Sequence, residues 1–222
     1  MGMRFPDREE AGRRLAAVLP QFRRRPDTVV LGLARGGVPV AAAVAEELQL
    51  PFSALAVRKL GVPGHEETAF GALAWFNGTV VRILNRPLMA RLLELGIPRS
   101  SLEQVESQAH MELRRRAEAY PGAPHDVQGK TVILADDGLA TGASMRAAVE
   151  AARGAGAATV LVAVPLASLH AQTALERRAD GVFSLHIPGQ FRAVGSYYTT
   201  FEQVHDADVV HLLGTQPDRA TD

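Results

Sequence analysis

The sequence has 222 residues, and its 24 Lys and Arg side chains balance 24 Asp and Glu side chains. This zero net charge argues against a strongly basic nucleic-acid binder and against an acidic solvating tail. Cysteine is absent, which excludes a disulfide framework, a thiolate metal site and a cysteine nucleophile. The length predicts one large domain, or one domain with an appendage.

The N-terminal residues contain no apolar segment that would form a signal peptide. A longer uncharged stretch, 154–175, is interrupted by Pro165, so we interpret it as a buried strand leading into a helix rather than as a membrane span. The sequence therefore predicts a cytoplasmic protein.

Helix and strand patterns alternate over the first part of the chain. The run TVVLGL predicts a buried strand, and the polar segment after the second strand predicts a loop because it contains Gly and Pro. The expected elements are a helix over 5–22, a strand over 28–33, a turn over 34–37, a helix over 38–48, a strand over 52–57 and a loop over 60–70.

A different unit follows, because Asn77-Gly78 between two apolar runs is a strong hairpin signal. Two helices should come next, and Ser100 or Ser101 can cap the second of them. The expected elements are strands over 72–76 and 79–83, helices over 87–95 and 101–120, and a loop over 121–129.

The alternation then resumes, with apolar, β-branched runs that suit a parallel sheet covered on both faces. The expected elements are strands over 131–135, 159–164 and 181–187, helices over 142–154, 168–178 and 205–213, and an irregular segment over 188–203. The sequence therefore predicts one α/β domain over 1–222. It should contain a central, mainly parallel sheet with helices on both faces and an inserted hairpin-and-helix element over 71–127.

Two carboxylates, Asp136 and Asp137, directly follow the strand expected over 131–135. The small residues after them open the next helix, so backbone N–H groups can converge on a phosphate there. The carboxylates can accept hydrogen bonds from hydroxyls, as in a ribose, or hold a hydrated Mg²⁺. A plain strand–turn–helix is the alternative, but it does not explain two carboxylates after a buried strand.

This stretch resembles the phosphoribosyl-pyrophosphate motif of the type I phosphoribosyltransferase family, in which two acidic residues bind the ribose hydroxyls and the next loop binds the 5′-phosphate. The resemblance implies that Asp136 and Asp137 are the acidic pair. It also implies a phosphate loop made of Ala140, Thr141, Gly142, Ala143 and Ser144. The resemblance covers about residues 25–190, apart from the insert.

The turn after the first strand contains Ala34, Arg35, Gly36 and Gly37. It matches neither the dinucleotide-binding fingerprint nor a P-loop. Its glycines allow a close backbone approach to an anion, although a glycine turn with a solvated arginine is the alternative. The resembling family has its pyrophosphate loop at this position, which implies that these residues hold the pyrophosphate of the donor.

Arg58 and Lys59 end the second strand, and Lys59 is one of only two lysines. Family members carry a flexible loop here that closes over the site and excludes water. The resemblance therefore implies that Arg58 and Lys59 contact pyrophosphate. It makes Glu66 or Glu67 a candidate general acid or base, with solvated loop charges as the alternative.

The aromatic residues of segment 186–201 are Phe191, Tyr197, Tyr198 and Phe201. The family has a variable hood that covers the base, so 188–203 is the hood candidate. Its aromatic rings could stack on a planar base, or they could be purely structural.

Ala140 stands where the 6-oxopurine branch of the family has an aspartate that transfers a proton, so this position cannot do acid–base chemistry. The string Asp-Asp-x-Leu-Ala-Thr-Gly is closer to the adenine branch. It is also similar to a group of bacterial predicted phosphoribosyltransferases.

The resemblance as a whole implies an enzyme that transfers ribose 5-phosphate from 5-phosphoribosyl-1-pyrophosphate to a nitrogenous, purine-type base. Mg²⁺ is the expected cofactor, held at Asp136 and Asp137. The catalytic set is Asp136, Asp137, Lys59 and Glu67. A non-catalytic regulator that binds the same donor is the alternative. Dimers are common in the family, so a homodimer is one assembly that the resemblance implies.

Two further clusters receive a plain interpretation. His205, Asp206, Asp208 and His211 are interpreted as a solvated terminal helix rather than a metal site. The arginine triplets 23–25 and 114–116 are interpreted as solvated faces, because the net charge is zero, with contact to RNA or another acidic partner as the alternative.

Overall fold

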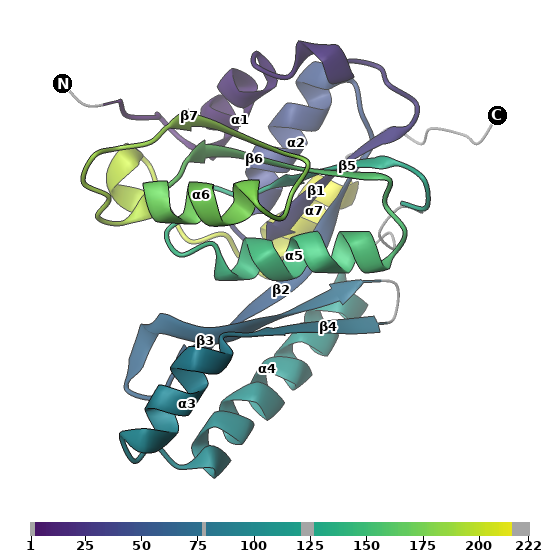
Figure 1. The fold of residues 1–222 in the computed structure, drawn as a ribbon. Helices are drawn as coiled ribbons and strands as arrows, with labels where there is room; N and C mark the ends of the chain where they lie inside the picture. Colours follow the sequence, from purple (N-terminus) through teal and green to yellow (C-terminus); the bar gives the residue numbers. More distant parts are fainter. Residues whose placement is uncertain (1–2, 77–78, 121–126, 215–222) are drawn as a thin grey trace.

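A seven-stranded sheet forms the centre of the computed structural model, which describes residues 3–76, 79–120 and 127–214 (Figure 1). From one edge to the other its strands are β4 (Thr79–Leu84), β3 (His65–Phe76), β2 (Phe52–Val62), β1 (Thr28–Ala34), β5 (Thr131–Ala135), β6 (Thr159–Leu166) and β7 (Gly181–His186). Strands β2, β1, β5, β6 and β7 pair in parallel, whereas β3 pairs antiparallel with both of its neighbours, β2 and β4. The sheet is mainly parallel, as predicted.

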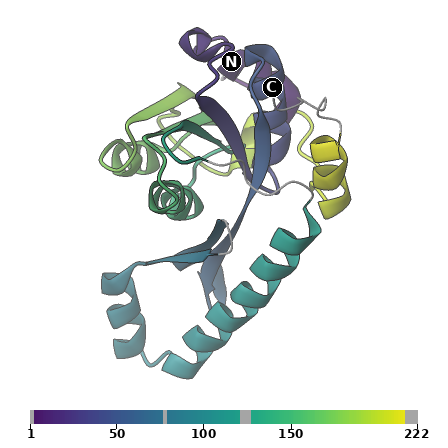
Figure 2. The same cartoon turned by 90° about the vertical axis from the view of Figure 1, so that its right-hand side faces the viewer.

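Helices cover both faces of this sheet. One face carries α1 (Arg8–Ala16), α2 (Gly37–Leu48) and α7 (Asp206–Gly214), and the other carries α5 (Ala143–Gly154) and α6 (Leu169–Glu176) (Figures 1 and 2). Successive side chains of β1 point to opposite faces of the sheet. Val30 packs in the core that includes α2, whereas Val29 and Leu31 pack in the core that includes α5. The predicted α/β class is therefore confirmed.

A lobe stands away from this layered part of the molecule (Figures 1 and 2). It consists of the end of β2, the strands β3 and β4, α3 (Arg86–Glu94) and α4 (Arg99–Ala119). Its own apolar cluster is centred on Leu60, Phe70, Leu73 and Leu113, all of them fully buried. The α4 lobe, as we call it, therefore has a separate small core joined to the main sheet through β2.

The predicted hairpin is confirmed, because β3 and β4 pair antiparallel and Phe76 aligns with Thr79. The Asn77-Gly78 turn itself lies outside the described residues, as does most of the loop predicted over 121–129.

The loop predicted over 60–70 is wrong. β2 continues to Val62, and β3 already begins at His65. Leu60, Val62 and Phe70 enter the apolar cluster of the α4 lobe, and this burial outweighs the Gly and Pro residues that suggested a loop. Shifts of strand register on both sides of Gly61 accommodate the irregular sequence.

Two helix ends also differ from the prediction. The helix expected over 5–22 ends at Ala16, and Pro20, which has no N–H to donate, begins a separate 3₁₀ turn, Pro20–Phe22. Pro98 precedes α4, so Ser100 and Ser101 lie inside its first turn and neither caps it. In the part of the chain that the structure describes, no helix is both long and apolar enough to cross a membrane.

Candidate functional site

Two sequence-predicted turns meet at the carboxyl ends of β1 and β5. The strands are neighbours, and Gly32 aligns with Ala135, so the residues that follow each strand lie side by side. A Cβ atom on Gly36 would overlap the Asp137 carboxylate, so a larger residue there would force that carboxylate to move. Gly37 is the first residue of α2, and the Ala34–Arg35 peptide bond is cis. The sheet thus brings the two predicted anion- and hydroxyl-binding turns into contact.

The acidic pair lies in surroundings that disfavour its charges. Burial raises the pKa of Asp136 well above its ordinary value, and the neighbouring Asp137 charge raises it further. Burial also raises the pKa of Asp137, although Arg8 partly opposes this. The Asp137 N–H donates to Asp136 Oδ1 over 2.9 Å. Hydroxyl groups or a cation placed here would stabilise the charged form of the pair.

Arg8, in the first turn of α1, is a site residue that the sequence analysis missed. Its Nε lies 2.9 Å from Asp137 Oδ2, and its Nη1 donates to the Glu202 carbonyl over 2.8 Å. Its guanidinium carbon lies 3.9 Å from the centre of the Phe201 ring. Arg8 therefore joins α1, the acidic pair and the segment before α7. More than 120 residues separate Arg8 from Asp137, and no local pattern signals this contact.

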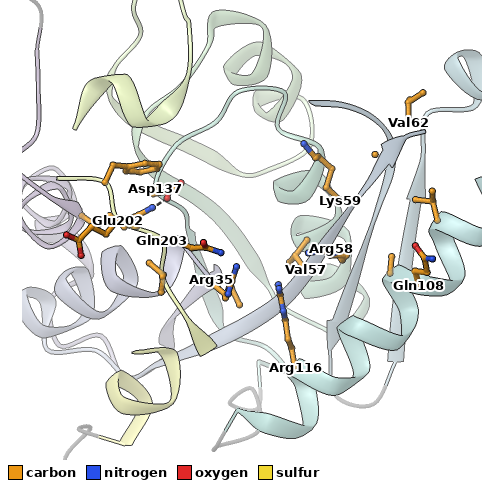
Figure 3. A pocket seen from close by; sticks show the side chains of 18 of the residues that line it. Arg35, Val57, Arg58, Lys59, Val62, Gln108, Arg116, Asp137, Glu202 and Gln203 are labelled. Atoms are coloured by element: carbon orange, nitrogen blue, oxygen red, sulfur yellow. Dashed lines mark hydrogen bonds and ion pairs between the residues drawn. The ribbon is translucent and has the colours of Figure 1, made fainter. Parts of the chain in front are cut away.

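A cavity of about 820 Å³ opens beside these turns. Figure 3 shows Arg35, Arg58, Lys59 and Arg116 around it. Arg8 is a fifth basic residue of the lining, whereas two of the described lining residues, Asp137 and Glu202, are acidic. In Figure 3 the Glu202 carboxylate points away from the other labelled side chains. The excess of positive charge suits a ligand with several negative charges.

One wall of the cavity comes from α4. Val105, Gln108, Ala109 and Arg116 line it, and their helical spacing places them on one side of α4. The Arg116 side chain is buried and pairs with Glu112 over 2.9 Å. The interpretation of the whole triplet 114–116 as a solvated face is therefore wrong for Arg116. The periodic positions 105, 109 and 116 were the signal that could have revealed this.

The predicted phosphate loop follows Asp137 but does not line this cavity. Gly142 has a φ of +69°, a left-handed conformation that favours glycine, and α5 begins at the next residue. The β6–α6 turn anchors the loop, because Ser168 Oγ donates to the Ala140 carbonyl over 2.6 Å. The exposed Thr141 accepts a hydrogen bond from the Ala143 N–H through its hydroxyl, and Ser144 is half-buried. The first N–H groups of α5 therefore lie at the end of this loop, where helices bind anions.

The candidates after β2 have mixed outcomes. Arg58 and Lys59 line the cavity, but they lie within a strand rather than before a loop. Glu66 and Glu67 belong to β3, and their side chains lie outside what the structure describes. The predicted acid–base role of Glu67 remains a prediction.

The aromatic residues of the hood candidate divide into two groups. Tyr198 is buried between Phe5 and Phe201, and its hydroxyl donates to the Asp137 carbonyl over 2.7 Å. Tyr197 packs on Phe191 away from the cavity. Phe201 alone among the four lines the cavity, so most of this segment is structural.

The acidic residues of α7, Asp206 and Asp208, do not line this cavity and have hydrogen-bond partners of their own. Asp206 accepts hydrogen bonds from Arg115 and from the Tyr120 hydroxyl, and Asp208 accepts one from the His205 N–H. Arg115 and Tyr120 hold the pKa of Asp206 below its ordinary value against the opposing effect of burial. The contacts of Asp206 tie α7 to the end of α4.

Comparisons with known proteins agree with this geometry. Residues 5–199 match the family model of the phosphoribosyl transferase domain. Proteins from two strains of Mycobacterium tuberculosis, both named "Putative phosphoribosyl transferase", are 41% identical to this chain over 211 residues, which is 94% of this chain and 46% of each relative. The chain thus spans about half the length of these curated relatives. A crystal structure from Thermus thermophilus is 41% identical, with a TM-score of 0.75, covering 95% of this chain and 98% of that one.

Proposed function

The chain belongs to the phosphoribosyl transferase domain family, and on that premise we propose that it transfers ribose 5-phosphate from 5-phosphoribosyl-1-pyrophosphate to a nitrogenous, purine-type base and releases pyrophosphate. One observation carries the proposal: an aspartate that follows β5 shares a cavity with basic side chains from β2, from α4 and from the turn after β1. The donor needs both, since its ribose offers hydroxyls and its pyrophosphate offers several negative charges.

The pyrophosphate would lie among Arg35, Arg58, Lys59 and Arg116. These four side chains come from β2, α4 and the turn after β1, so together they surround the ligand rather than forming a flat patch. The glycine turn allows its backbone to approach the same phosphates closely. Cations held in place before the reaction stabilise charge as it develops on the leaving group.

The ribose 5-phosphate would lie along the end of β5. Asp136 and Asp137 accept hydrogen bonds from the ribose hydroxyls, which stabilises carboxylates that burial otherwise disfavours. The 5′-phosphate binds at Ala140–Ser144, on the first N–H groups of α5 and the hydroxyl of Thr141. The chain thereby holds the donor at both ends.

In the proposed reaction the bond between ribose C1 and the pyrophosphate oxygen breaks, and its electron pair leaves with pyrophosphate. A nitrogen lone pair of the base forms the new bond to C1. The base then loses one proton, to Glu67 or to water, because Ala140 carries no group that could accept it. Positioning and charge stabilisation by the basic side chains supply most of the rate enhancement.

Mg²⁺ fits this site as an ion that arrives with the donor. Mg²⁺ prefers oxygen ligands and binds through one or two carboxylates plus substrate phosphates, which Asp136 and Asp137 can complement. Among the described residues, no group of three or more His, Asp or Glu could hold a metal by itself. When bound, the ion neutralises charge on the leaving pyrophosphate.

The acceptor base would lie between Arg8 and the α4 wall. The Phe201 ring stacks on Tyr198, and the Arg8 guanidinium also lies over this ring. Two neighbours this close cannot occupy the same face of the ring, so both faces of Phe201 are covered. A planar base would therefore stack on the guanidinium rather than directly on Phe201. The carboxamides of Gln108 and Gln203 line the same cavity, and each can both donate and accept at the edge of a base.

A pyrophosphate-release assay with the donor, Mg²⁺ and a panel of purine and pyrimidine bases tests this proposal. We expect release with at least one purine-type base. Release with pyrimidines only would overturn the acceptor assignment. Donor binding without release for any base would favour the non-catalytic regulator instead.

A further inference from the structure

A second cavity, of about 560 Å³, lies between the α4 lobe and the helices α5 and α6. In Figure 1 these two helices lie above β3, β4 and α3. The cavity shares no lining residue with the first cavity. Its volume falls within the range of small-molecule sites, which is about 300–1,000 Å³.

The charged lining of this second cavity is entirely basic. Its basic residues are Arg86, Arg146, His170, Arg177 and Arg178, and no described residue of the lining is an aspartate or a glutamate. Arg178 forms an ion pair over 3.2 Å with Glu150, which does not line the cavity. Within the described chain, Arg86, Arg146 and Arg177 have no ion pair with a carboxylate. An anion in the cavity would supply the missing counter-charge.

Arg146 is the half-buried member of this group. Burial and the charge of Arg178 both lower its pKa, so both disfavour its charged form. Its Nη1 donates to the Thr141 carbonyl over 3.3 Å. Three helices also contribute residues of their first turns to the lining: Arg86 and Pro87 of α3, Ala143 and Arg146 of α5, and His170 of α6. Helix N-termini add positive potential for an anion.

Apart from the polar Asn85, the remaining lining is apolar and comes mainly from β3, β4 and α6. It includes Ala72, Ile83, Leu84, Pro87 and Ala174. A ligand that fills this cavity therefore combines phosphate groups with a less polar body. Arginine forks match phosphate oxygens in pairs, which favours phosphate over a simple halide.

We propose that this second cavity binds a small phosphorylated molecule of nucleotide size, and that its occupancy is coupled to the phosphate loop through Arg146. A ligand that draws the Arg146 guanidinium toward itself weakens the contact with Thr141 and changes the loop on which the 5′-phosphate is proposed to bind. The binding part stands independently of the proposed reaction, whereas the coupling rests on it. By linkage, the donor would change the affinity of the second ligand by the same factor.

Calorimetric titration with inorganic tripolyphosphate in Mg²⁺-free buffer tests the binding part. The background variant Arg35→Gln with Arg58→Gln weakens anion binding in the first cavity. It should still bind tripolyphosphate at one site, in the second cavity. Adding Arg86→Gln with Arg177→Gln, both exposed side chains, should weaken that site at least tenfold. Adding Arg91→Gln instead is the matched control, because this exposed α3 arginine pairs with Glu94 outside the cavity.

The outcomes separate the two proposals. Absence of binding to the background variant, or equal binding after the Arg86 and Arg177 changes, would overturn the second site. Equal binding of the wild type and the background variant would instead count against the first cavity. For the coupling, saturating tripolyphosphate should change the donor affinity of the background variant at least threefold, and adding Arg146→Gln should abolish that change. An unchanged donor affinity would overturn the coupling.

Discussion

The carboxyl group of Asp136 is placed where its charge is unfavourable. Burial and the Asp137 charge raise its pKa well above that of a free aspartate. Because the folded pKa exceeds the unfolded one, this group stabilises the protein fully below the unfolded pKa, and that stability is lost as pH rises through the folded pKa. At neutral pH the ligand-free protein therefore retains a destabilising group that donor hydroxyls can stabilise.

We therefore expect Asp136→Asn to raise the Tm of the ligand-free protein at pH 7 in a buffer with a chelator, while donor binding is lost. The amide keeps the shape of the side chain and the hydrogen bond that Oδ1 accepts from the Asp137 N–H, but it removes the charge. Thermal unfolding across about pH 4 to pH 8 measures this effect, and the gain should shrink as pH falls.

Asp180→Asn is the matched control for that substitution. Asp180 accepts a hydrogen bond from the Val160 N–H over 2.7 Å and pairs with Arg153, and these contacts lower its pKa. Its stabilising effect is present above the unfolded pKa and is lost as pH falls. This variant should therefore have a lower Tm at pH 7. A lower Tm for both variants would contradict the assignment of Asp136 as a destabilising charge.

Lys59 is predicted to act in the reaction rather than in donor binding. If its ammonium group contacts the leaving pyrophosphate, Lys59→Ala loses a charge-assisted hydrogen bond worth about 1.5–3 kcal/mol, which lowers kcat roughly 10- to 150-fold. Donor affinity should fall much less. Steady-state kinetics and donor titration measure both quantities, with Lys130→Ala as the control because Lys130 lines neither of these cavities. An equal loss in affinity and kcat/KM would indicate ground-state binding instead.

At the scale of elements, α4 has two roles. Leu102 and Leu113 bury one side of it in the core of the α4 lobe, while Gln108 and Arg116 line the cavity. A helix that is fixed by its own core can hold a recognition surface with precision. The α4 lobe therefore positions Gln108, which is proposed to contact the acceptor, and Arg116, which is proposed to contact pyrophosphate.

We expect Gln108→Ala to raise the KM for the acceptor about 2- to 12-fold, which corresponds to a hydrogen bond of about 0.5–1.5 kcal/mol. The donor Kd should not change, because the proposed donor contacts involve other residues. Gln104→Ala, an exposed position on the same helix outside the cavity, should leave both constants unchanged. A shift in donor affinity alone would place Gln108 on the donor side of the cavity.

Elements with continuous apolar runs could be predicted from the sequence. β1 and β5 are buried along nearly their whole length, so their composition alone identifies them, together with the turns that follow. The pairing of β2 with β3 could not be predicted in this way. Several of the paired residues of β2 and β3 are buried in the core of the α4 lobe, together with residues of α4. Whether this segment forms strands therefore depends on contacts with residues that are distant in the sequence.

The candidate site divides along the same line. Arg35, Gly36 and Asp137 follow strands, and Arg58 and Lys59 lie within β2. The structure gathers all five around one cavity. Arg8 and Arg116 reach the same cavity from helices far away in the sequence. Only the packing of α1 against the sheet and of α4 against β2 brings them there. The contact of Arg8 has no local signature, whereas the helical spacing of positions 105, 109 and 116 marks the side of α4 that carries Arg116.

For the whole molecule, the first cavity lies where the layered sheet meets the α4 lobe. Its lining comes from β1 and the end of β5 on one side, and from β2 and α4 on the other. A donor bound there would contact both the layered part of the molecule and the α4 lobe, whose cores are otherwise joined through β2 and its neighbouring strands. Ligand binding should therefore stabilise the chain as a unit rather than one part of it.

Thermal unfolding with and without Mg²⁺ plus 5-phosphoribosyl-1-pyrophosphate measures this directly. Donor at 100 times its Kd adds roughly 2.7 kcal/mol, which for a chain of this size is a Tm increase of about 5–10 °C. The double variant Asp136→Asn with Asp137→Asn should lose the increase while remaining folded, since both side chains keep their shape. The Asp180→Asn variant should keep it, because Asp180 lies outside the cavity. If the wild type unfolds in a clear transition that the donor does not move, the cavity does not bind the donor, and the proposed reaction fails with it.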